Sequence, residues 1–203
     1  MNVTLGDLVD GLPRLRVEAG TAVDPRTVAE ALLIAVDDGL VAIRTTVPGS
    51  PRRTITCHAG AGSLVLPPGE SETLTALTDA AIVPISAVAR ERLIASPDRA
   101  RLLVDGLAET LRQKHGTIAS MSRLHHVDRV REKLIELARE HGRVGRDGIR
   151  LDFPLTHDLL GEMVGSARET VTRALDELQR EGFVSRRGRT YSVQLEPERL
   201  SSS

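Results

Sequence analysis

Cysteine, aromatic residues and lysine are scarce in this chain of 203 residues. A single cysteine, Cys57, excludes an internal disulfide and is typical of a reducing compartment. Because Phe, Tyr and Trp are absent before residue 153, most of the chain offers no aromatic face for stacking a purine or a sugar. Of the 27 basic residues, only Lys114 and Lys133 are lysine, which we attribute to a G+C-rich genome.

Long apolar runs and an excess of positive charge are also missing. No apolar run reaches the roughly 20 residues that span a bilayer, and the N-terminus lacks the order of a secretory signal. We therefore expect a cytoplasmic protein with no membrane partner. Residues 125–203 carry 14 basic and 14 acidic residues, so a prediction of nucleic-acid binding depends on where the charges lie. No catalytic triad, phosphate-binding loop or metal-ligand spacing is present, so we expect no enzyme and no metal site.

Residues 1–86 have the pattern of β structure. Short apolar or alternating runs predict strands at 30–36, at 40–44, at 53–59 and at two places between Glu72 and Ile85, broken at Asp79. Asp37-Asp38-Gly39 separates the first two runs and predicts a β-hairpin. Many short strands at this spacing are typical of a small sandwich or barrel.

Helical periodicity begins after Ser86. A short helix is predicted over 87–95, ended by Ser96-Pro97, and a longer helix follows. Its apolar positions recur at steps that average about 3.5 residues around Lys114, as in a coiled-coil seam. The predicted dimer interface consists of Val104, Leu107, Leu111, Ile118 and Met121. The alternative is a helix that lies on its own β domain.

From Val127 onward, the pattern predicts helix, strand, helix, tight turn, helix and hairpin, which is the order of a winged helix-turn-helix. The predicted boundaries are Gly142 for the end of the first helix, 149–153 for the strand, Thr156 to Gly165 for the second helix, Ser166 to Gly182 for the third, and a hairpin around Arg186-Arg187-Gly188-Arg189.

The helix that begins at Ser166 is predicted to read DNA. On a helical wheel its polar and apolar residues lie on opposite sides, as a recognition helix requires. Arginine can donate two hydrogen bonds to guanine, and glutamate can accept one from cytosine. The predicted base-reading residues are Arg168, Glu169, Thr172 and Arg173, and the predicted apolar side is Val171, Ala174, Leu175 and Leu178.

Two other interpretations of these residues stay open. Ser166 to Glu169 is also a capping box, in which Glu169 would satisfy a backbone donor, and the arginines would serve equally as solvated surface residues. Contacts to the DNA backbone are predicted for Thr156 and Ser166, at the two helix starts, and for the hairpin residues Arg186, Arg187 and Arg189. The alternative for the hairpin is a solvated polar turn.

These segments resemble a known family. Pro154 to Thr156, Leu159 to Gly165, Arg168 to Leu175 and Glu181 to Val184 resemble the winged-helix domain of the Crp/Fnr transcription regulators. By this resemblance, Arg168, Glu169 and Arg173 correspond to the base-reading residues of the catabolite-activator branch, which implies a half-site resembling GTGA. Asp176 departs from the pattern, because a neutral or basic residue is commoner there.

The front of the chain resembles the same family more weakly. Val17 to Gly20, the Asp38-Gly39 turn and Leu77 to Asp79 are similar to the β-roll of its cyclic-nucleotide-binding domain. The resemblance implies an α+β fold with an N-terminal, jelly-roll-like β-roll, a long dimerisation helix and a C-terminal winged helix-turn-helix. The expected domains are 1–96 for the β-roll sensor, 97–124 for the dimerisation helix and hinge, and 125–203 for the DNA-binding domain.

No cofactor is predicted. The family's cyclic-nucleotide binders hold the cyclic phosphate with an arginine followed by Ser or Thr, and Glu70-Ser71 stands in its place here. Because a carboxylate repels a phosphate, we expect no binding of cAMP or cGMP. One cysteine is too few for an iron–sulfur sensor. We also expect no haem, since a half-buried Cys57 beside an exposed His58 is commoner than a haem-ligand pair.

The sequence therefore predicts a sequence-specific, homodimeric transcription regulator that binds double-stranded DNA at a palindromic site. RNA polymerase is a further candidate partner. His125-His126 lies at the expected hinge, where protonation near pH 6.5 would bias the domain orientation; an ordinary linker is the alternative. The alternative function is a ligand-sensing or protein-interaction module whose winged helix binds a protein, which the near-neutral charge and Asp176 favour.

Overall fold

A computed structural model describes residues 5–46, 49, 52–121, 125–146, 148–188 and 190–195. Two predicted site positions lie outside this description, namely Arg189 and the side chain of Met121. The chain divides into two compact units, 1–117 and 118–203. Within the described ranges, no helix is both long and apolar enough to cross a bilayer.

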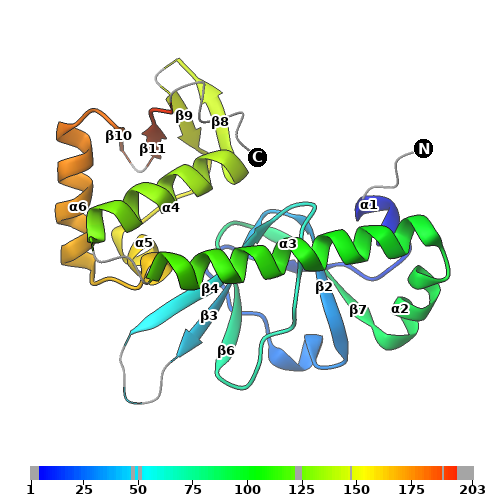
Figure 1. The fold of residues 1–203 in the computed structure, drawn as a ribbon. Coiled ribbons are helices and arrows are strands. Elements are labelled where there is room, and N and C mark those ends of the chain that lie inside the picture. Colours follow the sequence, from blue (N-terminus) through cyan, green and yellow to red (C-terminus); the bar gives the residue numbers. More distant parts are fainter. Residues whose placement is uncertain are drawn as a thin grey trace. The chain divides into compact units, whose positions relative to one another are not determined.

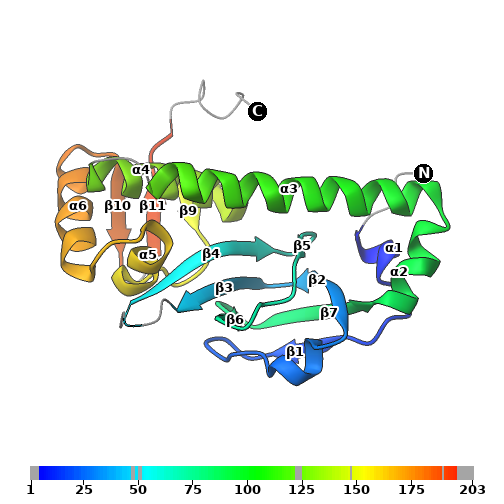
Figure 2. The same cartoon turned by 60° about the horizontal axis from the view of Figure 1, so that its bottom comes forward.

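The first unit contains two antiparallel sheets (Figures 1 and 2). Their strand orders are β1-β7-β2-β5 and β4-β3-β6. The strands are β1 (Leu15–Val17), β2 (Ala31–Asp38), β3 (Leu40–Thr46), β4 (Arg53–Gly60), β5 (Leu64–Val65), β6 (Glu72–Ala76) and β7 (Ala80–Ser86). The five strands predicted between residues 30 and 86 are confirmed, and the predicted β-roll is present.

The hairpin predicted at Asp37-Asp38-Gly39 is wrong. β2 lies between β7 and β5, and β3 lies between β4 and β6, so neither strand has a free edge for the other. A single residue, Gly39, separates the strands and turns the chain from one sheet into the other. Its φ is +79°, and a Cβ there would lie 2.2 Å from the carbonyl oxygen of Asp79. The Asp-Gly signal therefore marks a corner between sheets.

The core of the first unit has two layers because β2 is buried on both faces. Ile34 and Val36 belong to the cluster between the two sheets. The alternate residues Leu33 and Ala35 pack on the opposite face with residues of the helices, including Leu93. The helices are α1 (Leu5–Leu8), a 3-10 turn η1 (Pro25–Val28), α2 (Ala87–Ile94) and α3 (Pro97–Met121).

Two expectations for the first 86 residues are corrected by these elements. The region is not wholly β, because it contains α1 and η1, and an Asp24 cap followed by Pro25 starts η1. His58 is not exposed: Cys57, His58 and Ala59 are all buried, so the period-two alternation of β4 ends before residue 58.

One face of α3 packs on the β-roll and a neighbouring face stays exposed. Leu103 and Thr110 are buried, and the Thr110 hydroxyl donates a 2.6 Å hydrogen bond to the carbonyl oxygen of Leu64. The predicted seam lies elsewhere on the helix, and its described members are exposed: Val104, Leu107, Leu111 and Ile118. The helix thus lies on its own β domain, as the alternative expected, but through Leu103 and Thr110 and not through the described residues of the seam.

The second unit has the order of a winged helix-turn-helix. Its elements are α4 (His126–His141), β8 (Gly142–Gly145), β9 (Gly148–Leu151), α5 (His157–Val164), α6 (Arg168–Arg180), β10 (Val184–Arg187) and β11 (Thr190–Val193). The four strands form one sheet in the order β10-β11-β9-β8. Sequence reasoning missed β8, since a four-residue segment with two glycines has little strand propensity of its own.

The turn between α5 and α6 is confirmed, but the predicted start of α6 is wrong. Gly165 ends α5 in the left-handed conformation, with φ of +64°, as a C-terminal glycine does. The N-cap of α6 is Ala167, and no side chain caps it. The capping box from Ser166 to Glu169 is therefore absent. The Ser166 hydroxyl instead bonds to the side chains of His126 and Arg129, at 3.0 and 3.2 Å.

Candidate nucleic-acid interface

Helix α6 presents one polar side to solvent and buries the other. The predicted apolar residues are all buried: Val171, Ala174, Leu175 and Leu178. Arg168, Glu169 and Arg173, from the first two turns, are exposed, and so is Asp176. The division expected from the helical wheel is therefore confirmed. Long side chains able to reach base edges project from the N-terminal half of the helix.

The arginines of α6 have only weak internal partners. Arg168 Nη1 lies 3.5 Å from Asp158 Oδ2, and these two side chains are 64% and 65% exposed. Arg173 Nε donates a long hydrogen bond of 3.4 Å to the carbonyl oxygen of Glu169. An exposed ion pair contributes little to stability, so exchanging these contacts for a guanine or a phosphate loses little.

Thr172 differs from the other predicted base-reading residues. It is partly buried. Its hydroxyl lies 2.7 Å from His157 Nδ1 and 2.9 Å from the carbonyl oxygen of Arg168, to which it donates. The hydroxyl is thus engaged within the domain.

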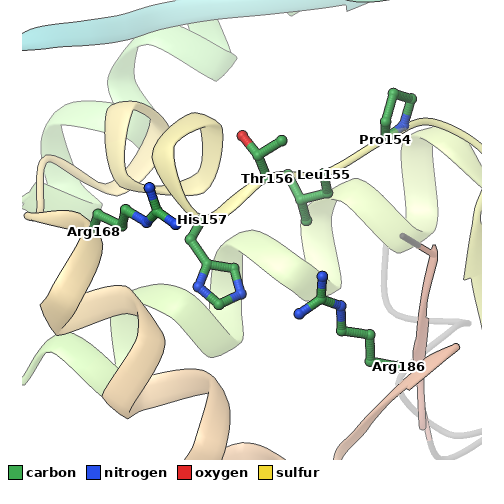
Figure 3. Close-up of a pocket in the computed structure, with 6 residues that line it drawn as sticks. All are labelled: Pro154, Leu155, Thr156, His157, Arg168 and Arg186. Atoms are coloured by element: carbon green, nitrogen blue, oxygen red, sulfur yellow. The ribbon is translucent and has the colours of Figure 1, made fainter. Parts of the chain in front are cut away.

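A pocket of about 340 Å³ lies beside the start of α6 (Figure 3). It is lined by Pro154, Leu155, Thr156, His157, Arg168 and Arg186. As predicted, Thr156 caps α5, since its hydroxyl accepts a 3.1 Å hydrogen bond from the Leu159 amide. In Figure 3 the His157 ring lies between the guanidinium groups of Arg168 and Arg186. A helix N-terminus beside two guanidinium groups suits an anionic group such as a phosphate.

The hairpin β10–β11 is confirmed, but two of its arginines lie on the strand. Arg186 pairs with Tyr191, and Arg187 pairs with Thr190. The Arg186 guanidinium lies 5.4 Å from the centre of the Tyr191 ring, and its Nε donates a 2.9 Å bond to the Gly188 carbonyl. Arg186 is thereby held at the edge of the pocket, and both Arg186 and Arg187 are exposed.

Sequence reasoning missed two residues of this site, His157 and Tyr191. The Tyr191 hydroxyl lies 2.9 Å from His157 Nε2. A signal was present, because a tyrosine in the centre of a small domain needs a partner for its hydroxyl. The identity of that partner depends on tertiary contact between α5 and β11, which no local pattern reports.

Two histidines of the second unit have lowered pKa values. Burial lowers the pKa of His157 below 6.5, helped by Arg186 and Arg168 and opposed by Asp176 and Asp158. Burial likewise lowers the pKa of His126, with further contributions from Arg129 and Arg173. The charged form of both side chains is therefore disfavoured in the folded domain.

A smaller pocket, of about 80 Å³, lies in the first unit between the β-roll and α3. It is lined by Ala59, Gly62, Ser63, Leu64, Gly106, Glu109, Thr110 and Gln113. Leu64 fills the space beside Gly106, where a Cβ would meet it at 2.7 Å. Glu70 is exposed, and Glu72 accepts a 3.0 Å hydrogen bond from the Gly69 amide.

Fold and site together define a class: a winged helix-turn-helix domain in a chain that begins with a β-roll and a long helix. The family model described as the Crp-like helix-turn-helix domain matches residues 128–202. Residues 128–202 thus form a Crp-like helix-turn-helix domain, as the resemblance in the sequence to the Crp/Fnr regulators predicts.

Curated relatives match part of the chain. A global nitrogen regulator of Synechocystis sp. is 34% identical over 89 residues, which cover 44% of this chain and 40% of the relative. A CRP-like cAMP-activated global transcriptional regulator of Mycobacterium tuberculosis is 27% identical over 140 residues, covering 68% of this chain and 62% of the relative. The match to the nitrogen regulators thus spans less than half of their length.

Solved structures share the fold over nearly the whole chain. A CooA mutant from Carboxydothermus hydrogenoformans has a TM-score of 0.78 at 17% identity and covers 98% of this chain and 95% of that one. FixK2 from Bradyrhizobium japonicum has a TM-score of 0.75 at 21% identity, covering 93% of this chain and 95% of its own. The α+β fold class expected from the sequence is confirmed.

Proposed function

We propose that the chain is a sequence-specific DNA-binding regulator and not an enzyme. In this proposal, α6 enters the major groove and reads bases with Arg168, Glu169 and Arg173, and Thr172 lies at the edge of the contact. Thr156, Ser166 and the hairpin arginines Arg186, Arg187 and Arg189 hold the backbone. The observation that carries the proposal is the exposed polar side of the first two turns of α6, over a fully buried apolar side.

The chain acts as a homodimer in this proposal, with residues 97–124 as the dimerisation helix between the 1–96 and 125–203 domains. The exposed side chains of Val104, Leu107, Leu111 and Ile118 support it, because they form an apolar stripe with coiled-coil spacing that the chain itself leaves uncovered. Two copies would place two α6 helices in successive major grooves, with half-sites about 34–36 Å apart. RNA polymerase is a further proposed partner.

We also propose that neither cAMP nor cGMP is the effector. Support comes from the exposed carboxylate of Glu70, which stands where a phosphate-binding arginine is expected. The pocket between the β-roll and α3, of about 80 Å³, is also well below the roughly 300 Å³ at which ligand pockets begin. Two of its lining residues, Thr110 and Leu64, are joined by a 2.6 Å hydrogen bond.

Selection of bound fragments from a random DNA pool, at about 0.15 M salt, tests the proposed function. We expect enrichment of a two-fold palindrome whose half-sites are one helical turn apart and resemble GTGA. A pool that stays random after repeated rounds, while the protein still binds all fragments, would contradict base reading. Absence of any binding at this salt concentration would favour the alternative, a winged helix that binds a protein.

A further inference from the structure

His157 connects the two halves of the proposed DNA-binding surface. It is the first residue of α5. Its Nδ1 lies 2.7 Å from the hydroxyl of Thr172 on α6, and its Nε2 lies 2.9 Å from the hydroxyl of Tyr191 on β11. A single imidazole thus spans the gap between the helix that is proposed to read bases and the hairpin that is proposed to hold the backbone.

The hydrogen bonds of Thr172 favour one tautomer of the His157 ring. When the Thr172 hydroxyl donates its one hydrogen to the carbonyl oxygen of Arg168, 2.9 Å away, it can only accept from His157 Nδ1. A neutral imidazole that donates from Nδ1 accepts at Nε2. The Tyr191 hydroxyl is therefore the donor to Nε2. The chain of bonds runs in one direction, from Tyr191 through His157 and Thr172 to the backbone of α6.

Protonation of His157 reverses its bond to Tyr191. A hydrogen on Nε2 would donate to the Tyr191 hydroxyl oxygen, and the hydroxyl's own hydrogen would lose Nε2 as its acceptor inside a residue that is 1% exposed. The charged groups around the ring are Arg168 and Asp176 from α6, Arg186 from β10 and Asp158 from α5. The two arginines and burial outweigh the two aspartates and lower the pKa of His157. Burial also raises the pKa of Tyr191, which keeps the phenol protonated as a donor.

We propose that His157 is a positioning residue that fixes the β10–β11 hairpin to α6 as its neutral, Nδ1-protonated tautomer, and that protonation of Nε2 weakens this attachment by removing the bond that Tyr191 donates. The expected effect on DNA rests on the proposed DNA-binding function. The bridge from Tyr191 through His157 to Thr172 does not. Arg168 and Arg186 lie on either side of the ring (Figure 3). The bridge therefore sets the spacing between a proposed base contact and a proposed phosphate contact.

The bridge is tested first without DNA, by nitrogen-15 NMR of the full chain labelled at histidine. We expect His157 to show a protonated Nδ1 and an unprotonated Nε2 at neutral pH, and to titrate below its ordinary pKa. Tyr191→Phe removes the donor to Nε2 and should raise the pKa of His157 toward its ordinary value. A ring that is protonated on Nε2 at neutral pH, or a titration that Tyr191→Phe leaves unchanged, overturns the proposal.

The consequence for DNA is tested by the ratio of affinities for the selected site and for random DNA, at about pH 7.5 and about pH 5.5. A positive charge on His157 strengthens binding to the selected site and to random DNA alike, so this contribution cancels in the ratio of the two affinities. We expect the wild-type ratio to fall about three- to tenfold on acidification, the range expected for the loss of one hydrogen bond. His157→Gln, whose amide donates and accepts without titrating, should keep the ratio at both pH values.

Two variants separate positioning from a general structural effect. His157→Phe should lower the ratio at both pH values, because it neither donates nor accepts. His126→Gln is the matched control, since His126 is the other histidine with a lowered pKa in this unit, and it should leave the pH dependence in place. A pH dependence that disappears in His126→Gln and persists in His157→Gln overturns the proposal. If no sequence is preferred at any pH, the proposed function fails, and the NMR titration still decides the bridge.

Discussion

The pockets described in the two units differ in size and in the charge of their lining. In the first unit, the polar groups between the β-roll and α3 bond to each other, as Thr110 does with Leu64, and leave a pocket of about 80 Å³. In the second unit, Arg168 and Arg186 line a pocket of about 340 Å³ beside the exposed side of α6. The first of these pockets is small, and the second is lined by two arginines. The proposed function therefore assigns the recognition chemistry of this chain to the second unit.

Core truncation should lower the stability of the two units equally, because the units differ in their surfaces and both have fully buried apolar cores. Leu74 in the first unit and Leu134 in the second are both fully buried. We expect Leu74→Ala and Leu134→Ala each to lower the free energy of unfolding by about 2–5 kcal/mol, measured by urea denaturation. Val144→Ala is the control, since Val144 is 86% exposed, and it should change stability by less than about 0.5 kcal/mol.

Removing charge from the hairpin should weaken DNA binding without changing its sequence preference. For Arg186→Gln with Arg187→Gln, the slope of log affinity against log salt should fall by roughly 0.9 for each phosphate that the variant no longer neutralises. Affinity for selected and random DNA should fall together. The matched control is Arg101→Gln, which removes an exposed arginine from α3 in the first unit. An equal loss of slope in the control would contradict the contrast between the units.

The start of α6 offers a smaller test within the second unit. Because Ala167 is the N-cap and no side chain satisfies the first amides, Ala167→Ser should stabilise the unit by about 1 kcal/mol. Thermal unfolding of the full chain would report this gain. A neutral or destabilising result would mean that Ser166 already caps the helix. Ser166→Ala would then lower the stability by a similar amount.

The smallest expected effect is that of a cyclic nucleotide on the first unit. Titration calorimetry with cAMP or cGMP should show no binding at micromolar concentration, and neither nucleotide should raise the thermal midpoint. Micromolar binding would show that the pocket between the β-roll and α3 widens to admit a nucleotide. Its small volume would then be a property of the unliganded state alone.

Local patterns predicted most of the fold, and they failed where tertiary context decides. The apolar side of α6, the cap at Thr156 and the turn at Gly165 follow from residue spacing and backbone preference, and all three are present. The Asp38-Gly39 turn was misread because strand pairing depends on which edges are free, which a two-residue signal does not report. Ser166 was misassigned because Arg129 and His126, distant in sequence, bond to its hydroxyl.

The exposed residues of the candidate site could be predicted from the sequence, and the hydrogen bonds that hold the site together inside the domain could not. Arg168, Glu169 and Arg173 were found from the helical wheel, which needs only the position of each residue along the helix. The bridge from Tyr191 through His157 to Thr172 joins three elements, so no periodicity within one element contains it.

The central claim is that α6 reads bases with its exposed arginines, and one comparison on a single helix tests it most directly. Arg173 lies in the second turn of α6 and Arg180 ends the helix, and both are exposed. Affinities for the selected site and for random DNA are measured for Arg173→Ala and for Arg180→Ala at constant salt. We predict that Arg173→Ala loses about 1–3 kcal/mol on the selected site and little on random DNA, while Arg180→Ala keeps the wild-type preference. Equal losses on both DNAs for Arg173→Ala, or the same loss of preference for Arg180→Ala, would contradict the account.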